Sequence, residues 1–144
     1  MNGPQVVRCM RDRPWSIEEL RGRAERYEAR GLEATFSFDP DHYVRKVLQR
    51  DERLEIALLC WDAGQASSIH DHRGSNCVVR VLSGCFVERL FRADSASGLY
   101  VELKARTIHP GDLTGVDGEQ VHQMINVAVG GRGAMLNFYS PPFS

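Results

Sequence analysis

Apolar residues follow two different spacings along this chain, helical in the first part and strand-like in the rest. Between positions 17 and 27, apolar side chains recur every three or four residues, as on one face of a helix. The run Ser16-Ile17-Glu18-Glu19 is a capping box that begins this helix, and Gly31 ends it. The pattern predicts one packing helix near the N-terminus.

A second, short helix is predicted from Asp39 to about Gln49. Asp39 can cap its N-terminus, and Pro40 suits the first helical position. Tyr43 and Arg45 would lie near its middle. Its apolar face would consist of Tyr43, Val44, Val47 and Leu48.

From Arg53 onward the pattern changes to short strands separated by turns that contain Gly, Ser and Asp. This organisation is typical of an all-β meander or barrel. The predicted strands cover 54–62, 76–83, 85–92, 99–107, 119–127 and 133–139. Because the chain contains no internal repeat or linker, we expect a single domain over 1–144, with a helical N-terminal segment at 1–50 and a β-barrel at 51–144.

Composition narrows the class of protein. With 144 residues, the chain is long enough to bury a core, and its net charge of −1 offers no basic field for nucleic acid or a membrane surface. No apolar run approaches the roughly 20 residues of a membrane span, and the N-terminus lacks the apolar region of a signal peptide. Cys9, Cys60, Cys77 and Cys85 form no Cys-x2-Cys pair, so a reduced cytoplasmic location is expected. We expect no nucleic-acid or membrane partner; the oligomeric state stays open, and a monomer is compatible with the sequence.

The candidate chemistry lies in the pattern Gly64-x5-His70-x-His72-x4-Cys77-x6-Gly84. Histidines two residues apart on a strand point to the same face and can share a metal ion. A lone histidine on a strand is more often a structural residue than a ligand. The glycines strengthen the metal interpretation, because they lie at strand ends where turns need positive φ.

A third ligand is needed, and His122 in His122-x3-Asn126 is the natural candidate. The result would be a site of three histidines without a protein carboxylate. His42 and His109 are expected to be non-ligands, since His42 lies in the predicted second helix and His109 precedes the Pro110-Gly111 turn.

These motifs resemble a known family. The histidine pattern is similar to the cupin layout Gly-x5-His-x-His-x4-Glu-x6-Gly, with Cys77 in place of the usual carboxylate. Together with further segments in the right order, it resembles the thiol dioxygenases, and the cysteine dioxygenase family in particular. The additional matching segments are Phe38-Asp39-Pro40-x-x-Tyr43-x-Arg45, Leu59-Cys60-Trp61, Ser67-Ser68-Ile69 and Tyr139-Ser140-Pro141-Pro142-Phe143.

The resemblance implies a cupin fold, a double-stranded β-helix or jelly-roll barrel, with Fe(II) held by His70, His72 and His122. Ligand type alone does not choose among iron, zinc, copper and nickel, and zinc with three histidines remains an alternative that can activate water. The resemblance favours iron, and charge supports a thiol substrate, because three neutral imidazoles leave the ion its full +2 charge and so lower the pKa of a bound thiol.

The resemblance also assigns residues to the substrate. Arg45 would grip a carboxylate through two parallel hydrogen bonds, and Tyr43 could add its hydroxyl. Relatives that prefer mercaptocarboxylates carry Gln at the position of Arg45, so the arginine indicates cysteine as the substrate. An arginine on a helix is more often simply exposed to solvent. A functional role for Arg45 is favoured over that alternative by its place in the matching segment.

Two positions near the C-terminal strand complete the site. In the family, residues at the positions of Cys77 and Tyr139 can be joined by a thioether bond, although a free Cys is usually a small buried apolar residue. The family commonly shows Ser-x-His-x-Tyr where this chain has Met135-x-Asn137-x-Tyr139. Asn137 can hydrogen-bond to the Tyr139 hydroxyl but cannot titrate near neutral pH. The resemblance also raises the expectation of a cis bond before Pro141.

The sequence thus leads to an Fe(II)-dependent thiol dioxygenase that uses O2 to oxidise L-cysteine to its sulfinic acid. Two alternatives stay open. A 3-mercaptopropionate or other small-thiol dioxygenase is favoured by Asn137. A non-catalytic metal cupin that binds or senses a small acid belongs to another class of protein.

Overall fold

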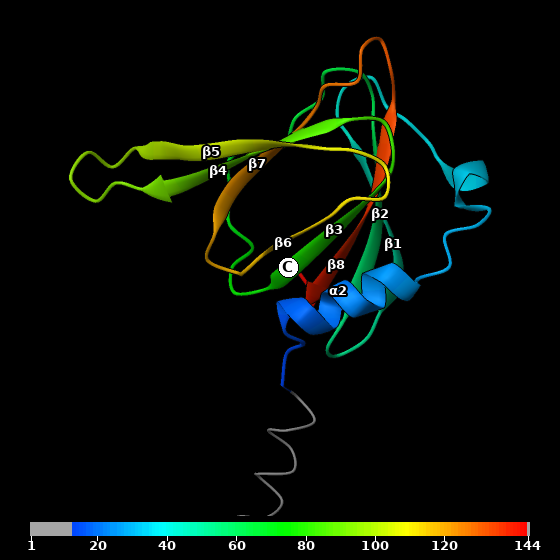
Figure 1. Ribbon diagram of the computed structural model, residues 1–144, viewed down its shortest axis with the longest axis horizontal. Helices are drawn as coiled ribbons and strands as arrows, with labels where there is room; N and C mark the ends of the chain where they lie inside the picture. Colours follow the sequence, from blue (N-terminus) through cyan, green and yellow to red (C-terminus); the bar gives the residue numbers. More distant parts are fainter. Residues whose placement is uncertain (1–12, 144) are drawn as a thin grey trace, which may run out of the picture.

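The computed structural model describes residues 13–143, which form one α-helix, one short 3-10 helix and eight strands (Figure 1). The helices are α2 (Ile17–Arg26) and η1 (Leu32–Thr35). The strands are β1 (Val44–Arg50), β2 (Glu55–Trp61), β3 (Asn76–Ser83), β4 (Phe86–Ala93), β5 (Tyr100–Ile108), β6 (Leu113–Val116), β7 (Val121–Asn126) and β8 (Gly133–Ser140). Within residues 13–143, no helix has the length and apolar character needed to cross a membrane.

The strands form two antiparallel sheets. One has five strands in the order β1-β2-β8-β3-β6, and the other has three in the order β5-β4-β7. The helix α2 packs against β3, β6 and β8 on the outer face of the larger sheet, and the smaller sheet lies on the other side (Figure 1). Non-consecutive neighbours within each sheet give the jelly-roll connectivity expected for a cupin.

Alternation along the central strands divides the apolar residues between two cores. On β8, Leu136 and Phe138 face α2, while Met135 and Tyr139 face the space between the sheets. The neighbouring strand β2 alternates in the same way and is buried along its whole length. Both strands therefore read as nearly continuous apolar runs, because each face of the sheet is covered.

The first predicted helix is confirmed, and so is its capping box. The Ser16 hydroxyl accepts a hydrogen bond from the Glu19 backbone N–H at 3.1 Å, and the Glu19 carboxylate accepts one from the Ser16 N–H at 3.0 Å. Gly31 has φ of +85° and lies directly before η1. The helix itself ends at Arg26, where the capping residue Tyr27 is extended with φ of −65°, so the prediction that Gly31 ends the helix is wrong.

The second predicted helix is wrong, because residues 44–50 form β1. Asp39 does not cap a helix; its carboxylate accepts a hydrogen bond from the Asp41 N–H at 2.8 Å within a turn. Over so short a segment, apolar residues at helical spacing do not exclude a strand, and the β-branched Val44 and Val47 favour one. Pairing with the exposed edge of β2 decides the outcome.

All six predicted strands are present, as β2, β3, β4, β5, β7 and β8. The four-residue strand β6 and the strand β1 were not predicted. Gly84, between β3 and β4, has φ of +85°, and a Cβ at this position would lie 2.8 Å from the Gly133 Cα. Both the turn and the close approach of β8 therefore require glycine here.

Candidate active site

The three predicted histidines come together between the sheets. His70 and His72 lie in the loop that joins β2 to β3, and His122 lies on β7. Reciprocal backbone hydrogen bonds of 2.9 and 2.8 Å tie His70 to His122. One ring nitrogen from each of the three histidines lies within 4.8 Å of the others. His70 and His72 are thus placed by this isolated bridge rather than by a long strand.

Hydrogen bonds select which nitrogen faces the centre in two of the three rings, His70 and His122. The Nδ1 of His70 lies 2.7 Å from the Ser68 carbonyl, and the Nδ1 of His122 lies 2.7 Å from a Glu88 carboxylate oxygen. Each Nδ1 therefore carries the proton, which leaves Nε2 free to bind a metal. The Nε2 atoms of His72 and His122 lie 3.2 Å apart, a separation that suits two ligands of one cation.

The surroundings keep the rings of His70 and His72 neutral. Burial, followed by the neighbouring His122 and His70, lowers the pKa of His72 to about 3. Burial also lowers the pKa of His70. The buried Nδ1 of His72 has no hydrogen-bond partner among residues 13–143. Three imidazoles directed at one point match the donor set of a divalent transition metal, so the residues fit the expected ion.

A carboxylate that the sequence analysis did not single out supports His122. Glu88 on β4 is fully buried and also accepts a hydrogen bond from Arg106 Nε at 2.7 Å, and Nη2 of Arg106 lies 2.6 Å from the same oxygen in an ion pair. Burial raises the pKa of Glu88, but the hydrogen bonds and charges of His122 and Arg106 together outweigh burial, so that the pKa lies below its usual value. A buried anion at Nδ1 fixes the orientation of the His122 ring and makes its Nε2 a stronger ligand.

The histidines line a small cavity of about 70 Å³. Tyr43 and Arg45 form part of its wall, and Tyr43 stacks on Trp61 with 4.2 Å between ring centroids. Phe143 lines the cavity as well, stacked on Tyr139 at 5.3 Å and edge-on to His72 at 5.4 Å. A volume of this size admits a short polar molecule and excludes a bulky one.

Arg45 reaches the cavity from β1 rather than from a helix. Its guanidinium carbon lies 5.3 Å from the centroid of the Tyr139 ring, and its Nη2 donates a hydrogen bond to Glu55. Burial lowers the pKa of Arg45, but the hydrogen bond and charge of Glu55, with a contribution from Tyr139, raise it overall. A permanent cation therefore lines the cavity, and its carboxylate partner Glu55 was not expected from the sequence.

Cys77 and Tyr139 are direct Cα partners on the paired strands β3 and β8. Both are buried, and burial is the main cause that raises the pKa of each side chain. The Asn137 amide donates a hydrogen bond to the Tyr139 hydroxyl at 2.9 Å, as predicted. The phenol is thus neutral, oriented by Asn137 and adjacent to Cys77. The peptide bond between Ser140 and Pro141, which follow Tyr139 in the chain, is cis.

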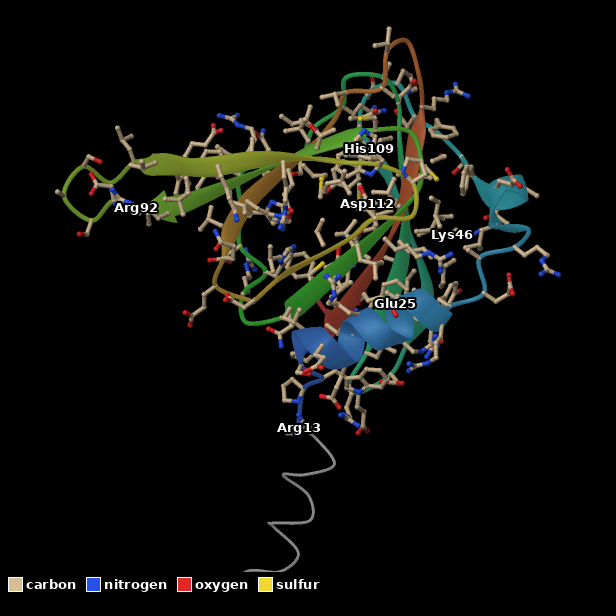
Figure 2. All side chains as sticks on the ribbon, in the orientation of Figure 1. Arg13, Glu25, Lys46, Arg92, His109 and Asp112 are labelled. Atoms are coloured by element: carbon tan, nitrogen blue, oxygen red, sulfur yellow. The ribbon has the colours of Figure 1, made fainter. Side chains whose placement is uncertain are left out.

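The two remaining histidines lie outside the cluster. The side chain of His42 is 72% exposed and that of His109 is 63% exposed. His109 lies beside Asp112 in the turn between β5 and β6 (Figure 2). Both positions agree with the prediction that these residues are not ligands.

Comparison with solved structures supports the fold. A structure from Thermus thermophilus matches with a TM-score of 0.65 at 21% identity, over 80% of this chain and 98% of its own. A cupin protein from Desulfovibrio desulfuricans matches with a TM-score of 0.58 at 19% identity, over 81% of this chain and 99% of its own.

Sequence comparison is more specific. The cysteine dioxygenase type 1 of Rattus norvegicus is 32% identical over 133 residues, which are 89% of this chain and 66% of that protein. The Homo sapiens protein of the same name is 31% identical over the same shares. The chain thus spans just under two thirds of the length of these relatives. The family model for cysteine dioxygenase type I matches residues 5–144. The chain belongs to the cysteine dioxygenase type I family.

Proposed function

We propose that the protein is an Fe(II)-dependent dioxygenase that converts L-cysteine and O2 to cysteine sulfinic acid. The observation that carries this proposal is the opening of the three-histidine cluster into the same 70 Å³ cavity that Arg45 lines. His70, His72 and His122 would hold the ion through Nε2. Fe(II) held there would bind the substrate thiolate and activate O2. The reaction balances without another co-reactant, since both oxygen atoms end on sulfur.

Arg45 and Tyr43 bind the substrate carboxylate in this proposal. Arg45 uses one edge of its guanidinium for Glu55 and retains further N–H groups for a second carboxylate. The small cavity then requires a short link between carboxylate and thiol. Cysteine meets this requirement.

Tyr139 positions the reacting group. Because Asn137 donates to the Tyr139 oxygen, the phenolic O–H is left to donate a hydrogen bond into the cavity. Burial raises the pKa of Tyr139, so this proton stays in place at neutral pH. A thioether bond between Cys77 and Tyr139 would fix the ring further; its formation removes two hydrogens, which O2 can accept. The adjacent Cα positions of the two residues support this part of the proposal.

A second candidate substrate is 3-mercaptopropionate or another small thiol acid. Asn137 favours it, because the chain lacks the titrating imidazole that the family commonly has beside the tyrosine. In a third interpretation, the protein binds a metal and a small acid without turnover. We further propose a cytoplasmic location, since Cys60, Cys77 and Cys85 are free thiols.

Oxygen uptake with a panel of thiols tests the proposal. Iron-loaded protein should consume one O2 per cysteine and yield a product heavier by two oxygen atoms. Binding without uptake would identify a sensor, and faster turnover of 3-mercaptopropionate would identify the second candidate.

Metal content tests the ligand set. Replacing His122 with Ala should remove most of the iron and nearly all turnover, because three ligands leave little redundancy. His109→Ala is the matched control and should retain both. Full iron content in His122→Ala would show that the third ligand is wrong.

A further inference from the structure

Glu55 carries an ionisable side chain that the reaction as described does not use. It begins β2, and its side chain is fully buried. It shares a strand face with Ala57 and Leu59, which belong to the core between the sheets. Its Cα partners are Arg50 on β1 and Tyr139 on β8. Glu55 therefore lies under the wall of the cavity without being part of its lining.

Two arginines share this carboxylate. Oε2 accepts the hydrogen bond from Arg45, and Oε1 accepts one from Arg50 at 2.8 Å. The Arg50 side chain is 53% exposed and lies away from the cavity lining, whereas the Arg45 side chain is 30% exposed and belongs to it. A buried carboxylate is costly unless it is paired, and here both oxygens are occupied. Arg50 thus holds Glu55 from the solvent-exposed side, and Glu55 holds Arg45 without lining the cavity itself.

Holding Arg45 in this way has two opposite effects on a substrate carboxylate. The guanidinium is fixed before the substrate arrives, so the substrate is placed accurately, and a displacement of about 1 Å can cost on the order of 100-fold in rate. At the same time, Glu55 competes for the charge of Arg45 and repels a second carboxylate on the other edge of the guanidinium. The substrate carboxylate is therefore placed more accurately, but it is bound less tightly.

We propose that Glu55 is a positioning residue that orients Arg45 for the substrate carboxylate at the expense of binding strength. This inference rests on the proposed function, in which Arg45 binds the carboxylate of a thiol substrate. It predicts a separation of kcat from affinity that a purely structural carboxylate would not produce.

The test compares iron-loaded parent, Glu55→Gln, Arg45→Gln and the double variant, with Glu102→Gln as the matched control, because Glu102 is a paired carboxylate outside the cavity lining. Turnover of L-cysteine gives kcat, and calorimetry under anaerobic conditions gives the Kd of L-cysteine. Glu55→Gln should lower kcat about 10- to 100-fold, as a displaced guanidinium implies. It should also lower Kd about threefold or more, because the charge of Arg45 is no longer offset by a neighbouring carboxylate. Glu102→Gln should change both by less than about threefold, since Glu102 bonds to Arg89 at the surface, where the pair is largely screened.

The double variant separates action through Arg45 from general damage. In the Arg45→Gln background, adding Glu55→Gln should leave kcat and Kd nearly unchanged, because coupled residues are not additive. Glu55→Asp, which keeps the charge but shortens the side chain, should retain the parent Kd and lose kcat, and it serves if Glu55→Gln fails to fold. Weaker cysteine binding in Glu55→Gln, unchanged kcat, or additive losses in the double variant would overturn the inference. A parent that binds cysteine without turnover would instead refute the proposed function, and the Kd comparison would still test Glu55.

Discussion

The hydrogen bond between Glu88 and His122 gives a quantitative prediction about metal affinity. Replacing Glu88 with Gln keeps the shape of the side chain but removes its charge and one acceptor. In the parent, Oε2 accepts from His122 at 2.7 Å while Oε1 accepts from Arg106. A Gln has only one oxygen, so its NH2 group must face either His122 or Arg106, both of which are donors. The variant cannot satisfy both partners.

The loss should appear mainly as weaker metal binding. Removing a hydrogen-bond partner of a ligating histidine typically costs about 10- to 100-fold in metal affinity. This corresponds to about 1.4–2.7 kcal/mol. The Arg106 side chain is 36% exposed and can be hydrated when its partner is lost, which limits the damage to folding. We therefore expect a folded protein with a raised Kd for the metal.

Anaerobic competition with a chromophoric chelator measures this Kd, for Fe(II) and for redox-inert Zn(II). Glu102→Gln is the matched control, because Glu102 bonds to Arg89 across the same β4-β5 hairpin but is 39% exposed and lies outside the cavity lining. The control should bind metal within about twofold of the parent, as expected for a surface pair. If Glu88→Gln also stayed within that range, or if both variants lost affinity equally, the assigned role of Glu88 would be refuted.

Three further predictions concern the tyrosine and the core. Tyr139→Phe should retain iron, lower cysteine turnover at least about fivefold through loss of one hydrogen bond, and abolish any crosslinked species on a denaturing gel; parent-level turnover would remove Tyr139 from the proposal. Because burial raises the pKa of Tyr139, the phenol keeps its proton through neutral pH and adds no inflection to the pH–rate profile there. Asn137→His should therefore add a new inflection near pH ~6.5, below which the imidazole is cationic. The same inflection in the parent would contradict this account. Phe138→Ala should lower the free energy of unfolding in urea by about 3–5 kcal/mol, since Phe138 is fully buried, whereas the control Val129→Ala at an exposed loop position should change it by less than about 0.5 kcal/mol; equal effects would show that the core has been misassigned.

Local sequence was sufficient for several features. The Ser16 and Glu19 capping box depends only on residues three positions apart, so it could be recognised without the fold. The central strands could be located because alternating or continuous apolar runs persist for seven or eight residues in β2, β3 and β8. The spacing of His70 and His72, with His122 on a later strand, was enough to predict a shared site.

Long-range pairing decided the rest. Residues 44–50 carry apolar side chains at positions that fit either a helix or a strand, and only the free edge of β2 makes the strand the better solution. Glu55 and Glu88 could not be recognised as buried, because charged residues are mostly exposed unless a partner is present. Their partners Arg45 and Arg106 stand 10 and 18 residues away in the sequence. A buried carboxylate becomes favourable only when folding brings those guanidinium groups to it. The sequence therefore determined which histidines form the cluster, and tertiary packing determined which carboxylates hold His122 and Arg45 in place.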